Sequence, residues 1–379
     1  MPYDLVPDAR ALADAARGFA RDVAAPLAAR CERERTHDRA LFREAAALGL
    51  TAVQTPREMG GLGLPFAARA AVAEALGEAC WGVAMAVINT HNAAFRLARM
   101  AGGDLRGRLL PGLLSGELVG CTAMTEPHAG SDFAALRTTA RRDGDGWRLD
   151  GEKAWVVNAA HADVIVVFAQ TGEIGDAKGV AGFVVETAGE GARVATCGGF
   201  AGLHAMGLGG LVLEGYRAPE EALILPPGGA FRQALEDVNG ARAHVAAMCC
   251  GILESALAEA TAYGRERHAF GKPLAAHQDW RRTLARAEAD LAAARLTVRE
   301  AARAIDAGED AQLPAATAKL VAVETAARHL PAAAHAMGAA GLGEDSRMAR
   351  HLLGVRGAAL ADGSTEMLLE RVARLSRSV

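Results

Sequence analysis

The sequence predicts an α+β fold made of an N-terminal helical domain, a small central antiparallel β-barrel or sandwich, and a C-terminal four-helix bundle. Two observations predict this order. Apolar residues recur at helical spacing toward both ends of the chain, whereas short β-branched runs separated by glycines fill its middle. The length of 379 residues and the hydrophobic share of 51% provide for two or three domains with a large core. We expect the domains to span residues 1–118, 119–228 and 229–379.

The first segment carries an Ala- and Leu-rich helical pattern from residue 11 to residue 118, with Leu12, Ala16 and Phe19 as an example of the spacing. A glycine-rich stretch that ends in Pro65 interrupts this pattern. The stretch lacks the GxGxxG spacing and the preceding strand of a dinucleotide-binding loop. We therefore interpret residues 60–65 as a loop that connects two helices.

The middle segment predicts strands at residues 147–150, 164–168, 183–185 and 211–213. The turn sequence DGDG at residues 143–146 precedes the first of them and predicts a hairpin. No helix of ten residues separates these strands, whereas a parallel crossover usually contains such a helix. An antiparallel barrel or sandwich is therefore expected.

The helical pattern returns at Phe231 and continues toward the end of the chain. One seam of apolar residues follows alternating spacings of three and four and ends at Gly308, which is typical of a bundle helix. Its members are Leu284, Ala287, Leu291, Ala294, Val298, Ala301 and Ile305. A second helix is predicted from Ala315 to His329, with Pro331 ending it.

The charge balance and the apolar runs exclude several classes of protein. Lys and Arg number 41 against 45 Asp and Glu, which leaves a net charge of -4 and no excess of positive charge for a nucleic acid. No segment resembles a signal sequence, and the best apolar run, Val245–Leu253, is too short to cross a bilayer. We expect a cytoplasmic protein with neither a nucleic-acid nor a membrane partner.

The histidines and cysteines do not predict a metal site. The 11 histidines lack ligand spacing, and none of the six cysteines belongs to a CxxC pair. The cysteines are expected to be reduced thiols that pack as small apolar groups. They are Cys31, Cys80, Cys121, Cys197, Cys249 and Cys250.

Three longer motifs occur in order along the chain. The first is GELVGCTAMTEPHAGSD at residues 116–132, the second is RHAFGKPL at residues 267–274, and the third is DGSTEM at residues 362–367. Together they resemble the acyl-CoA dehydrogenase family of flavoproteins over essentially the whole chain. The resemblance implies an FAD-dependent enzyme that introduces an α,β double bond into an acyl-CoA thioester. It also implies electron transfer to an electron-transferring flavoprotein, and a homo-oligomer that is expected to be a tetramer.

The first motif offers hydroxyls, backbone N–H groups and small residues, which allow a close approach to a planar ring and a pyrophosphate. An ordinary glycine turn between domains is the alternative. The resemblance assigns contacts with FAD to Thr122, Met124, Thr125, Gly130 and Ser131, and a contact with the CoA ligand to Ser131 as well.

Trp155 lies in a segment, KAWVVN, that is similar to the family's strand beside the flavin, and the resemblance places its indole on one face of the ring. An ordinary core tryptophan is the alternative. Val157 stands where the family usually has Thr or Ser, which donates toward flavin N5. Valine has nearly the same shape but cannot donate, so that side-chain hydrogen bond is lost.

The second motif supplies an arginine suited to a pyrophosphate and a phenylalanine suited to a ring contact, and the glutamine that follows supplies a polar amide. The resemblance implies that Arg267, Phe270 and Gln278 reach the FAD of a neighbouring subunit. His335 and Gly338 occupy positions that relatives use near the adenosine. Without the resemblance, the Arg-x-x-Phe-Gly pattern indicates only a helix end followed by a turn.

The third motif contains Asp362, which the resemblance identifies as the base that removes the α-proton while hydride leaves the β-carbon for the flavin. Many relatives have Glu here, and Asp is shorter by roughly 1.5 Å. Either the substrate lies closer to the base, or its reacting carbon is unusual, or another group is the base. The position that some relatives use instead is Ala241 in this chain. A helix N-cap is the structural alternative for Asp362.

Neighbouring residues complete the expected site. Ser364 and Glu366 are assigned to the flavin side, and Asn239, Arg242 and Gly363 to the substrate. The same scaffold also fits a dehydrogenase of carrier-protein-bound acyl groups, a desulfinase or a flavin monooxygenase. A helical scaffold or DNA-protecting relative is the non-enzymatic alternative, and the balanced charge argues against it.

Overall fold

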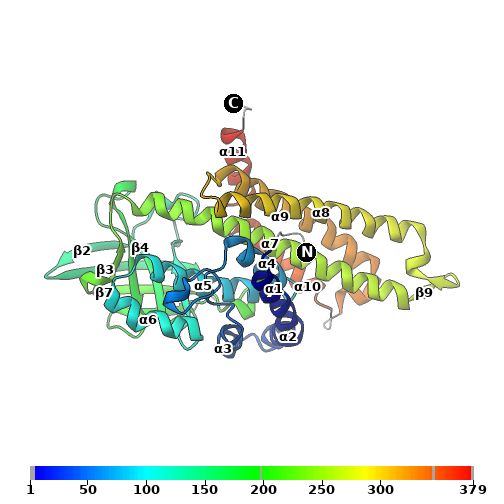
Figure 1. Ribbon diagram of the computed structural model, residues 1–379, viewed down its shortest axis with the longest axis horizontal. Coiled ribbons are helices and arrows are strands. Elements are labelled where there is room, and N and C mark those ends of the chain that lie inside the picture. Colours follow the sequence, from blue (N-terminus) through cyan, green and yellow to red (C-terminus); the bar gives the residue numbers. More distant parts are fainter. Residues whose placement is uncertain (1–4, 197–198, 344–345, 377–379) are drawn as a thin grey trace.

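The computed structural model describes residues 5–196, 199–343 and 346–376. Figure 1 shows an elongated molecule with the β-domain at one end and long bundle helices that run from it to the other end. The first N-terminal helices lie along the middle of the bundle, whereas α5 (Trp81–Met100) and α6 (Gly103–Ser115) lie beside the β-domain. The C-terminal helix α11 (Thr365–Leu375) projects from the bundle. The predicted order of helical domain, β-domain and helical bundle is therefore confirmed.

The N-terminal domain is helical as predicted. Its α-helices are α1 (Pro7–Phe19), α2 (Ala25–Glu34), α3 (Ala40–Ala47), α4 (Phe66–Gly77), α5 (Trp81–Met100) and α6 (Gly103–Ser115). The loop predicted at residues 60–65 leads directly into α4. Asp306, at the end of the bundle helix α8 (Gln278–Asp306), caps α4, because its carboxylate accepts hydrogen bonds from the backbone N–H groups of Phe66 (2.6 Å) and Ala67 (2.9 Å). This cap ties the N-terminal domain to the bundle.

The strands of the β-domain form one sheet in the order β6-β7-β3-β2-β4-β5-β8, with β1 beside β4. They are β1 (Gly120–Ala123), β2 (Thr139–Asp143), β3 (Gly146–Val156), β4 (Val164–Gln170), β5 (Val180–Glu186), β6 (Ala192–Thr196), β7 (Gly209–Ala218) and β8 (Leu223–Leu225). The predicted strands lie within β3, β4, β5 and β7, and the predicted hairpin joins β2 to β3.

Most strand pairings are antiparallel as predicted, but β4 has two parallel neighbours. β1 pairs with β4 in parallel over its whole length, and β2 pairs with β4 in parallel at Thr139 and Gln170. The sequence prediction missed these pairings because it required a helix for a parallel crossover. Here the strands between β1 and β4 provide the return path instead.

The C-terminal helices are α7 (Ala230–Glu266), α8 (Gln278–Asp306), α9 (Gln312–Ala336), α10 (Met348–Leu360) and α11 (Thr365–Leu375). The apolar seam predicted in α8 is confirmed, since its members are buried except for Ile305, which is half-buried against the core. The prediction that Pro331 ends a helix is wrong, because α9 continues to Ala336. Burial of Leu330 and Ala333 in the core offsets the backbone hydrogen bond that the proline cannot donate.

Helix α7 is longer and more apolar than the sequence prediction allowed. Within the described ranges it is the one helix whose length and hydropathy would permit a membrane span, but most of its apolar window is buried inside the protein. It packs against α4, α8 and α9 as a core helix. The cysteines at described positions are buried and form no disulfide, as expected, whereas Cys197 lies outside the described residues.

Two glycines allow α4 and α7 to cross in direct backbone contact. A Cβ atom on Gly77 of α4 would lie 2.4 Å from the carbonyl oxygen of Met248, and one on Gly251 of α7 would lie 1.9 Å from the carbonyl oxygen of Glu74. Both distances are far shorter than a normal carbon contact of about 3.5–4.0 Å. Any larger residue at either position would therefore separate two helices that line the same cavity.

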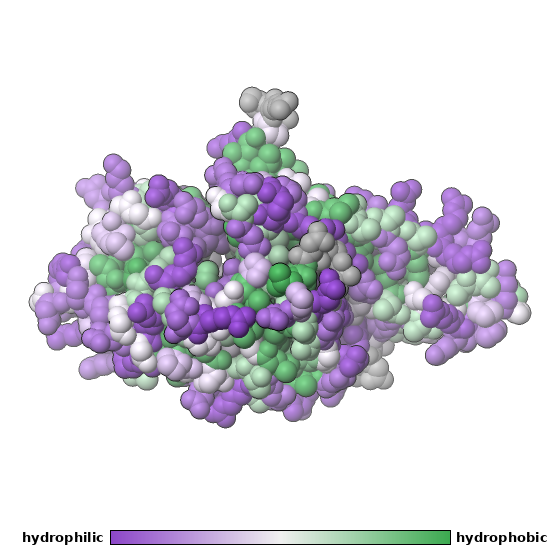
Figure 2. All heavy atoms as spheres, viewed as in Figure 1, coloured by the Kyte–Doolittle hydropathy of each residue, from purple (hydrophilic) through white to green (hydrophobic). Residues whose placement is uncertain are grey.

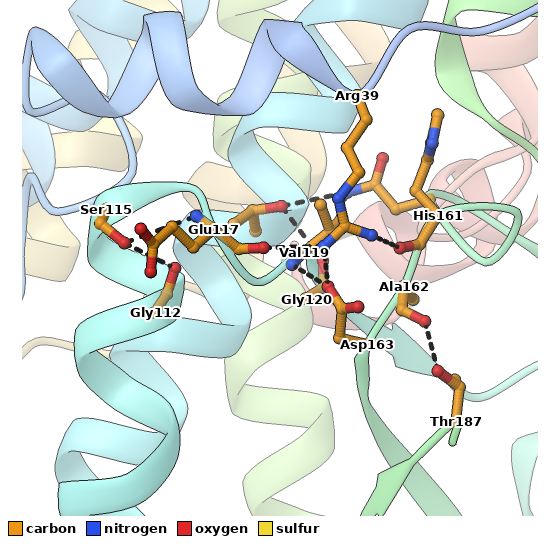
Figure 3. Close-up of polar contacts among 12 residues, drawn as sticks. Arg39, Gly112, Ser115, Glu117, Val119, Gly120, His161, Ala162, Asp163 and Thr187 are labelled. Atoms are coloured by element: carbon orange, nitrogen blue, oxygen red, sulfur yellow. Dashed lines mark hydrogen bonds and ion pairs between the residues drawn. The ribbon is translucent and has the colours of Figure 1, made fainter.

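An arginine next to α3 joins the helical domain to the β-domain. Arg39 donates hydrogen bonds to the carbonyl oxygens of His161 (2.8 Å) and Glu117 (2.7 Å) and forms an ion pair with Asp163 (Figure 3). The Asp163 carboxylate also accepts a hydrogen bond from the backbone N–H of Val119 at 2.8 Å. Because Val119 directly precedes β1, this network fixes the point at which the chain enters the sheet.

We expect Asp163→Ala to lower the melting temperature, because it removes the acceptor of the Val119 N–H and the ion-pair partner of Arg39. Leaving a donor without an acceptor costs about 1–3 kcal/mol where the donor is buried. Differential scanning fluorimetry measures the change. Asp145→Ala, in the exposed turn between β2 and β3, is the matched control. An equal change in both variants would contradict the role given to Asp163.

Candidate active site

A cavity of about 930 Å³ lies where the three domains meet. Its walls come from α4 and α5, from β1 and the loop after it, from β3, from α7, and from the connection between α8 and α9. Ala361 and Asp362, in the turn that precedes α11, complete the lining. The first and third sequence motifs, which are far apart in the chain, therefore meet at one site.

The wall formed by the first motif is held by a buried ion pair. Lys153 Nζ lies 2.7 Å from Glu126 Oε1, and both side chains are almost fully buried. The Glu126 carboxylate also accepts two backbone N–H bonds, at 2.6 Å and 2.9 Å. The N–H of Ala154 bonds to the carbonyl oxygen of Thr125 at 3.0 Å, which aligns the motif with the end of β3. The residues of this motif that line the cavity are Thr122, Met124 and Thr125.

Trp155 lines the cavity from a backbone conformation that is unfavourable for a residue with a side chain. Its φ is 56°, in the left-handed region, and 50% of its surface is exposed. Its ring stacks on Phe200 with the centroids 5.4 Å apart. The alternative of an ordinary core tryptophan is therefore wrong. Residues with strained backbones such as Trp155 cluster at ligand sites. Val157, two positions further along the chain, also lines this wall of the cavity.

Asp362 lies in a tight turn that two cations hold through its carbonyl groups. The φ of Asp362 is 54°, and that of Gly363 is 102°. Lys319 Nζ donates to the carbonyl oxygen of Ala361 and, at 2.5 Å, to that of Gly363. Arg242 Nε donates to the carbonyl oxygen of Asp362 at 3.1 Å. Both cations therefore fix the backbone of the turn and leave the carboxylate free.

The surroundings of Asp362 set its affinity for a proton. Burial raises the pKa of its carboxyl group, and the positive charges of Lys319, Arg242 and Arg69 oppose that rise. Burial also lowers the pKa of Lys319 to about 8 and the pKa of Arg242 to about 10. The carboxylate is thus a stronger base than an exposed aspartate, in cationic surroundings that favour its ionised form.

Among the carboxylates that line the cavity, Asp362 is the one to which the described residues give neither a hydrogen bond nor an ion pair. Each of the others has a partner. The pairs are Asp237 with Arg96, Asp306 with Phe66, Glu309 with Arg303, Asp310 with Gln312, and Glu236 with Arg232. The Asp362 oxygens are therefore available to accept a proton from a bound ligand.

Three of the other residues assigned to the substrate lie in or beside the turn of Asp362, whereas Ser131 does not. Asn239 lines the cavity, and its Oδ1 accepts a hydrogen bond from Arg242 Nη1 at 3.1 Å. Arg242 and Gly363 do not line the cavity themselves but hold the turn of Asp362. Ser131 is exposed in the loop after β1, outside the cavity lining.

The structure excludes the N-cap alternative for Asp362. The N-cap of α11 is Ser364, whose hydroxyl accepts from the N–H of Met367 at 3.4 Å. Glu366 is exposed in the first turn of that helix. Neither Ser364 nor Glu366 lines the cavity, and Gly130 lies outside it as well, with open space where a Cβ atom would be.

The second motif lies at the other end of the bundle, where Figure 1 shows the hairpin of β9 (His268–Ala269) and β10 (Lys272–Pro273). Arg267 follows the last residue of α7, and Phe270 occupies the hairpin tip with φ 52° and 98% exposure. This geometry agrees with the helix-end-and-turn interpretation of the motif. Gln278 begins α8, which spans about 40 Å before its far end reaches the cavity.

His335 and Gly338 lie at the same end of the bundle as Gln278. Trp280, in the first turn of α8, donates from Nε1 to the carbonyl oxygen of Ala336 at 3.1 Å. That contact places the last turn of α9 beside the first turn of α8. The residues assigned to FAD thus form two groups in one protomer, one at the cavity and one at the hairpin end.

Sequence reasoning missed three cations at the site: Arg69 and Arg96 line the cavity, and Lys319 holds the turn of Asp362. Arg69 stands in the apolar run FAARAAVAEA, and Lys319 stands in AATAKLVAV. Arg96 is the third, and it binds both Asp237 (2.5 Å) and the hydroxyl of Thr122 (2.8 Å). A lone basic residue inside an apolar helical run is the available signal, because such a side chain is seldom buried without a specific partner.

Three family models match the chain in order. They describe the acyl-CoA dehydrogenase N-terminal domain at residues 7–117, the middle domain at residues 121–216, and the C-terminal domain at residues 228–376. The mitochondrial short-chain specific acyl-CoA dehydrogenase of Bos taurus is 32% identical over 353 residues, which cover 93% of this chain and 85% of the relative.

Solved structures agree with these matches. Butyryl-CoA dehydrogenase from Megasphaera elsdenii is 28% identical with a TM-score of 0.93, and the match covers 99% of both chains. A glutaryl-CoA dehydrogenase from Mycobacterium smegmatis, in complex with FADH2, is 27% identical with a TM-score of 0.91, over 98% of this chain and 94% of that one. With the family's three domains in order and its first and third motifs gathered around one cavity, this chain belongs to the acyl-CoA dehydrogenase family.

Proposed function

We propose that this chain dehydrogenates an acyl-CoA thioester between its α- and β-carbons, with Asp362 as the base and FAD as the oxidant. The observation that carries the proposal is the carboxylate of Asp362, which has no partner among the described residues and lines the cavity from a turn held by Lys319 and Arg242. The substrate class rests on the family, whose named members above act on acyl-CoA thioesters.

The residues of the cavity wall fit a flavin. Thr122, Thr125 and Trp155 offer hydroxyls and an exposed aromatic face, which suit polar and stacking contacts with a flat heterocycle. Val157 adds an apolar contact but no side-chain donor, so polar contacts at that point must come from the backbone. When bound, FAD would supply the two-electron oxidant that accepts hydride from the β-carbon.

Asp362 would take the α-proton onto a free carboxylate oxygen, while the electron pair of that C–H bond stays to form the new double bond. Burial strengthens the base, and the neighbouring cations favour its ionised form before the reaction. Position matters because a misplacement of about 1 Å can cost about a hundredfold in rate. The carbonyl contacts of Lys319 and Arg242 supply that positioning for a side chain shorter than Glu.

The proposal includes a homo-oligomer, expected to be a tetramer, in which the hairpin end of one protomer reaches the FAD of another. The residues assigned to this role are Arg267, Phe270, Gln278, His335 and Gly338. In support, Phe270 is 98% exposed, and Leu360 and Leu369 near the C-terminus are 75% and 50% exposed. Figure 2 shows apolar surface on the projecting α11. An electron-transferring flavoprotein would reoxidise the flavin, as the family likeness implies.

Asp362→Asn keeps the shape of the side chain but removes the base. Anaerobic flavin reduction by acyl-CoA should therefore slow by about 10²–10⁴-fold, as stopped-flow absorbance of the flavin band would measure. Asp362→Glu restores a base with longer reach and should retain measurable reduction. Glu370→Gln, at an exposed position of α11, is the control and should behave as the parent.

Unchanged reduction by the Asn variant would show that Asp362 is not the base. Bleaching of the parent by carrier-protein thioesters, but not by CoA thioesters, would assign the carrier-protein alternative instead. Oxygen consumption supported by reduced flavin, without bleaching by any thioester, would favour a monooxygenase.

The pH dependence of flavin reduction should report the raised pKa of Asp362. The rate is expected to increase with pH through an apparent pKa above the usual aspartate value, because only the ionised carboxylate accepts a proton. Lys319→Gln keeps N–H donors for the turn carbonyls but removes a charge that lowers this pKa. The rising limb should then move to higher pH. An unmoved limb, or one at lower pH, would contradict the electrostatic assignment.

Phe270→Ala tests the contribution of the hairpin end to a neighbouring subunit. An exposed side chain adds little to the stability of its own protomer, so the melting temperature of FAD-free protein should hardly change. FAD retention after gel filtration should fall if the side chain contacts the cofactor of another subunit. Full retention, with an unchanged oligomer by analytical ultracentrifugation, would argue against that contact.

A further inference from the structure

Within the described part of the chain, one buried arginine of the cavity has no charged partner. Arg69, on α4, is 6% exposed and lines the cavity together with Asp362. Its Nη1 donates to Gln54 Oε1 at 2.9 Å, and its Nη2 approaches His244 Nδ1 at 2.7 Å. Its Nε–H has no acceptor, and among the described residues no carboxylate forms an ion pair with this guanidinium.

The two acceptors that Arg69 does have are neutral. A guanidinium only donates, so His244 Nδ1 must be the unprotonated nitrogen of its ring. Burial and the charge of Arg69 hold the pKa of His244 well below its usual range. His91 is neutral for the same reasons, and its Nε2 accepts from the N–H of Gln54 at 3.1 Å. This cluster of four residues therefore contains one buried positive charge, and two of its N–H groups, Arg69 Nε–H and His91 Nδ1–H, have no acceptor among the described residues.

The negative charges that act on Arg69 belong to carboxylates with other roles. Asp237 and Asp362 are the carboxylates whose charges act on Arg69. Asp237 is paired with Arg96 at 2.5 Å, and Asp362 is the proposed base. Burying a charge is unfavourable unless it is paired, and an arginine that faces a ligand cavity can receive its counter-ion from the ligand.

We propose that Arg69 binds a carboxylate at the far end of the acyl chain, so that the preferred substrates are acyl-CoA thioesters with a second carboxylate. The inference rests on the proposed function, which puts the thioester beside Asp362 in this cavity. The guanidinium offers the free Nε–H and further N–H donors in a plane, the geometry that suits a carboxylate. The ring of Phe66, 5.2 Å below the guanidinium, and Met85 offer apolar contacts for the methylene groups.

The test compares binding of matched thioesters to FAD-loaded Asp362→Asn protein, which cannot carry the reaction forward. Isothermal titration would use succinyl-, glutaryl- and adipyl-CoA, each against the acyl-CoA of equal chain length that ends in a methyl group. At one length or more, the carboxylate should bind about 30-fold or more tightly than its methyl counterpart. Adding Arg69→Met should abolish that ratio, and Arg69→Lys should retain part of it.

Arg99→Gln provides the matched control, because Arg99 is an exposed cation of the same cavity and its loss should leave the ratio unchanged. Equal or tighter binding of the methyl-ended thioester at every length overturns the inference, and so does a preference that survives Arg69→Met. If Arg69→Met fails to fold, the inference is decided by the protein with Arg69 intact, from the ratio of its affinities for the carboxylate-ended and methyl-ended thioesters. Failure of every thioester to bind would overturn the proposed acyl-CoA function itself.

Discussion

The site depends on the carboxylate of Asp362, which has no partner among the described residues although Lys319 and Arg242 lie beside it. These two cations bind backbone carbonyl groups instead. Lys319 and Arg242 could neutralise Asp362 by direct ion pairs, but their donors point at the carbonyl oxygens of the turn. The charges therefore stabilise the ionised carboxylate from a short distance and leave its oxygens unoccupied. A direct ion pair would lower the pKa of the same carboxyl group and would occupy the oxygens that must accept a substrate proton.

The scaffold holds this arrangement at a junction of elements from all three domains. The backbone contacts at Gly77 and Gly251 fix α4 against α7, which carries Asn239 and His244 to the cavity and Arg242 to the turn of Asp362. The buried pair of Lys153 and Glu126 fixes the opposing segment of the β-domain. The helices thus bring cations to the cavity, and a strand brings a strained tryptophan. The walls of this cavity come from all three domains.

Periodicity predicted the helical domain, most strands and the apolar seam of α8, because these features depend on local spacing. It did not predict the parallel pairing of β1 with β4, which depends on how distant strands meet. Resemblance pointed to Asp362 and Trp155, but the free state of the Asp362 carboxylate depends on partners more than a hundred residues away, such as Arg242. Arg69 was missed because a single charged letter in an alanine-rich run does not reveal what surrounds it.

Hydrogen exchange at the α-carbon tests the central claim most directly. A 3-thia-acyl-CoA has sulfur in place of the β-carbon and cannot lose hydride, so in D₂O any α-deuterium incorporated with the FAD-loaded protein reports proton removal alone. Mass spectrometry should show incorporation with the parent protein and none above background with Asp362→Asn. Equal incorporation by both proteins would mean that another group removes the proton, and would contradict the assignment of Asp362 as the base.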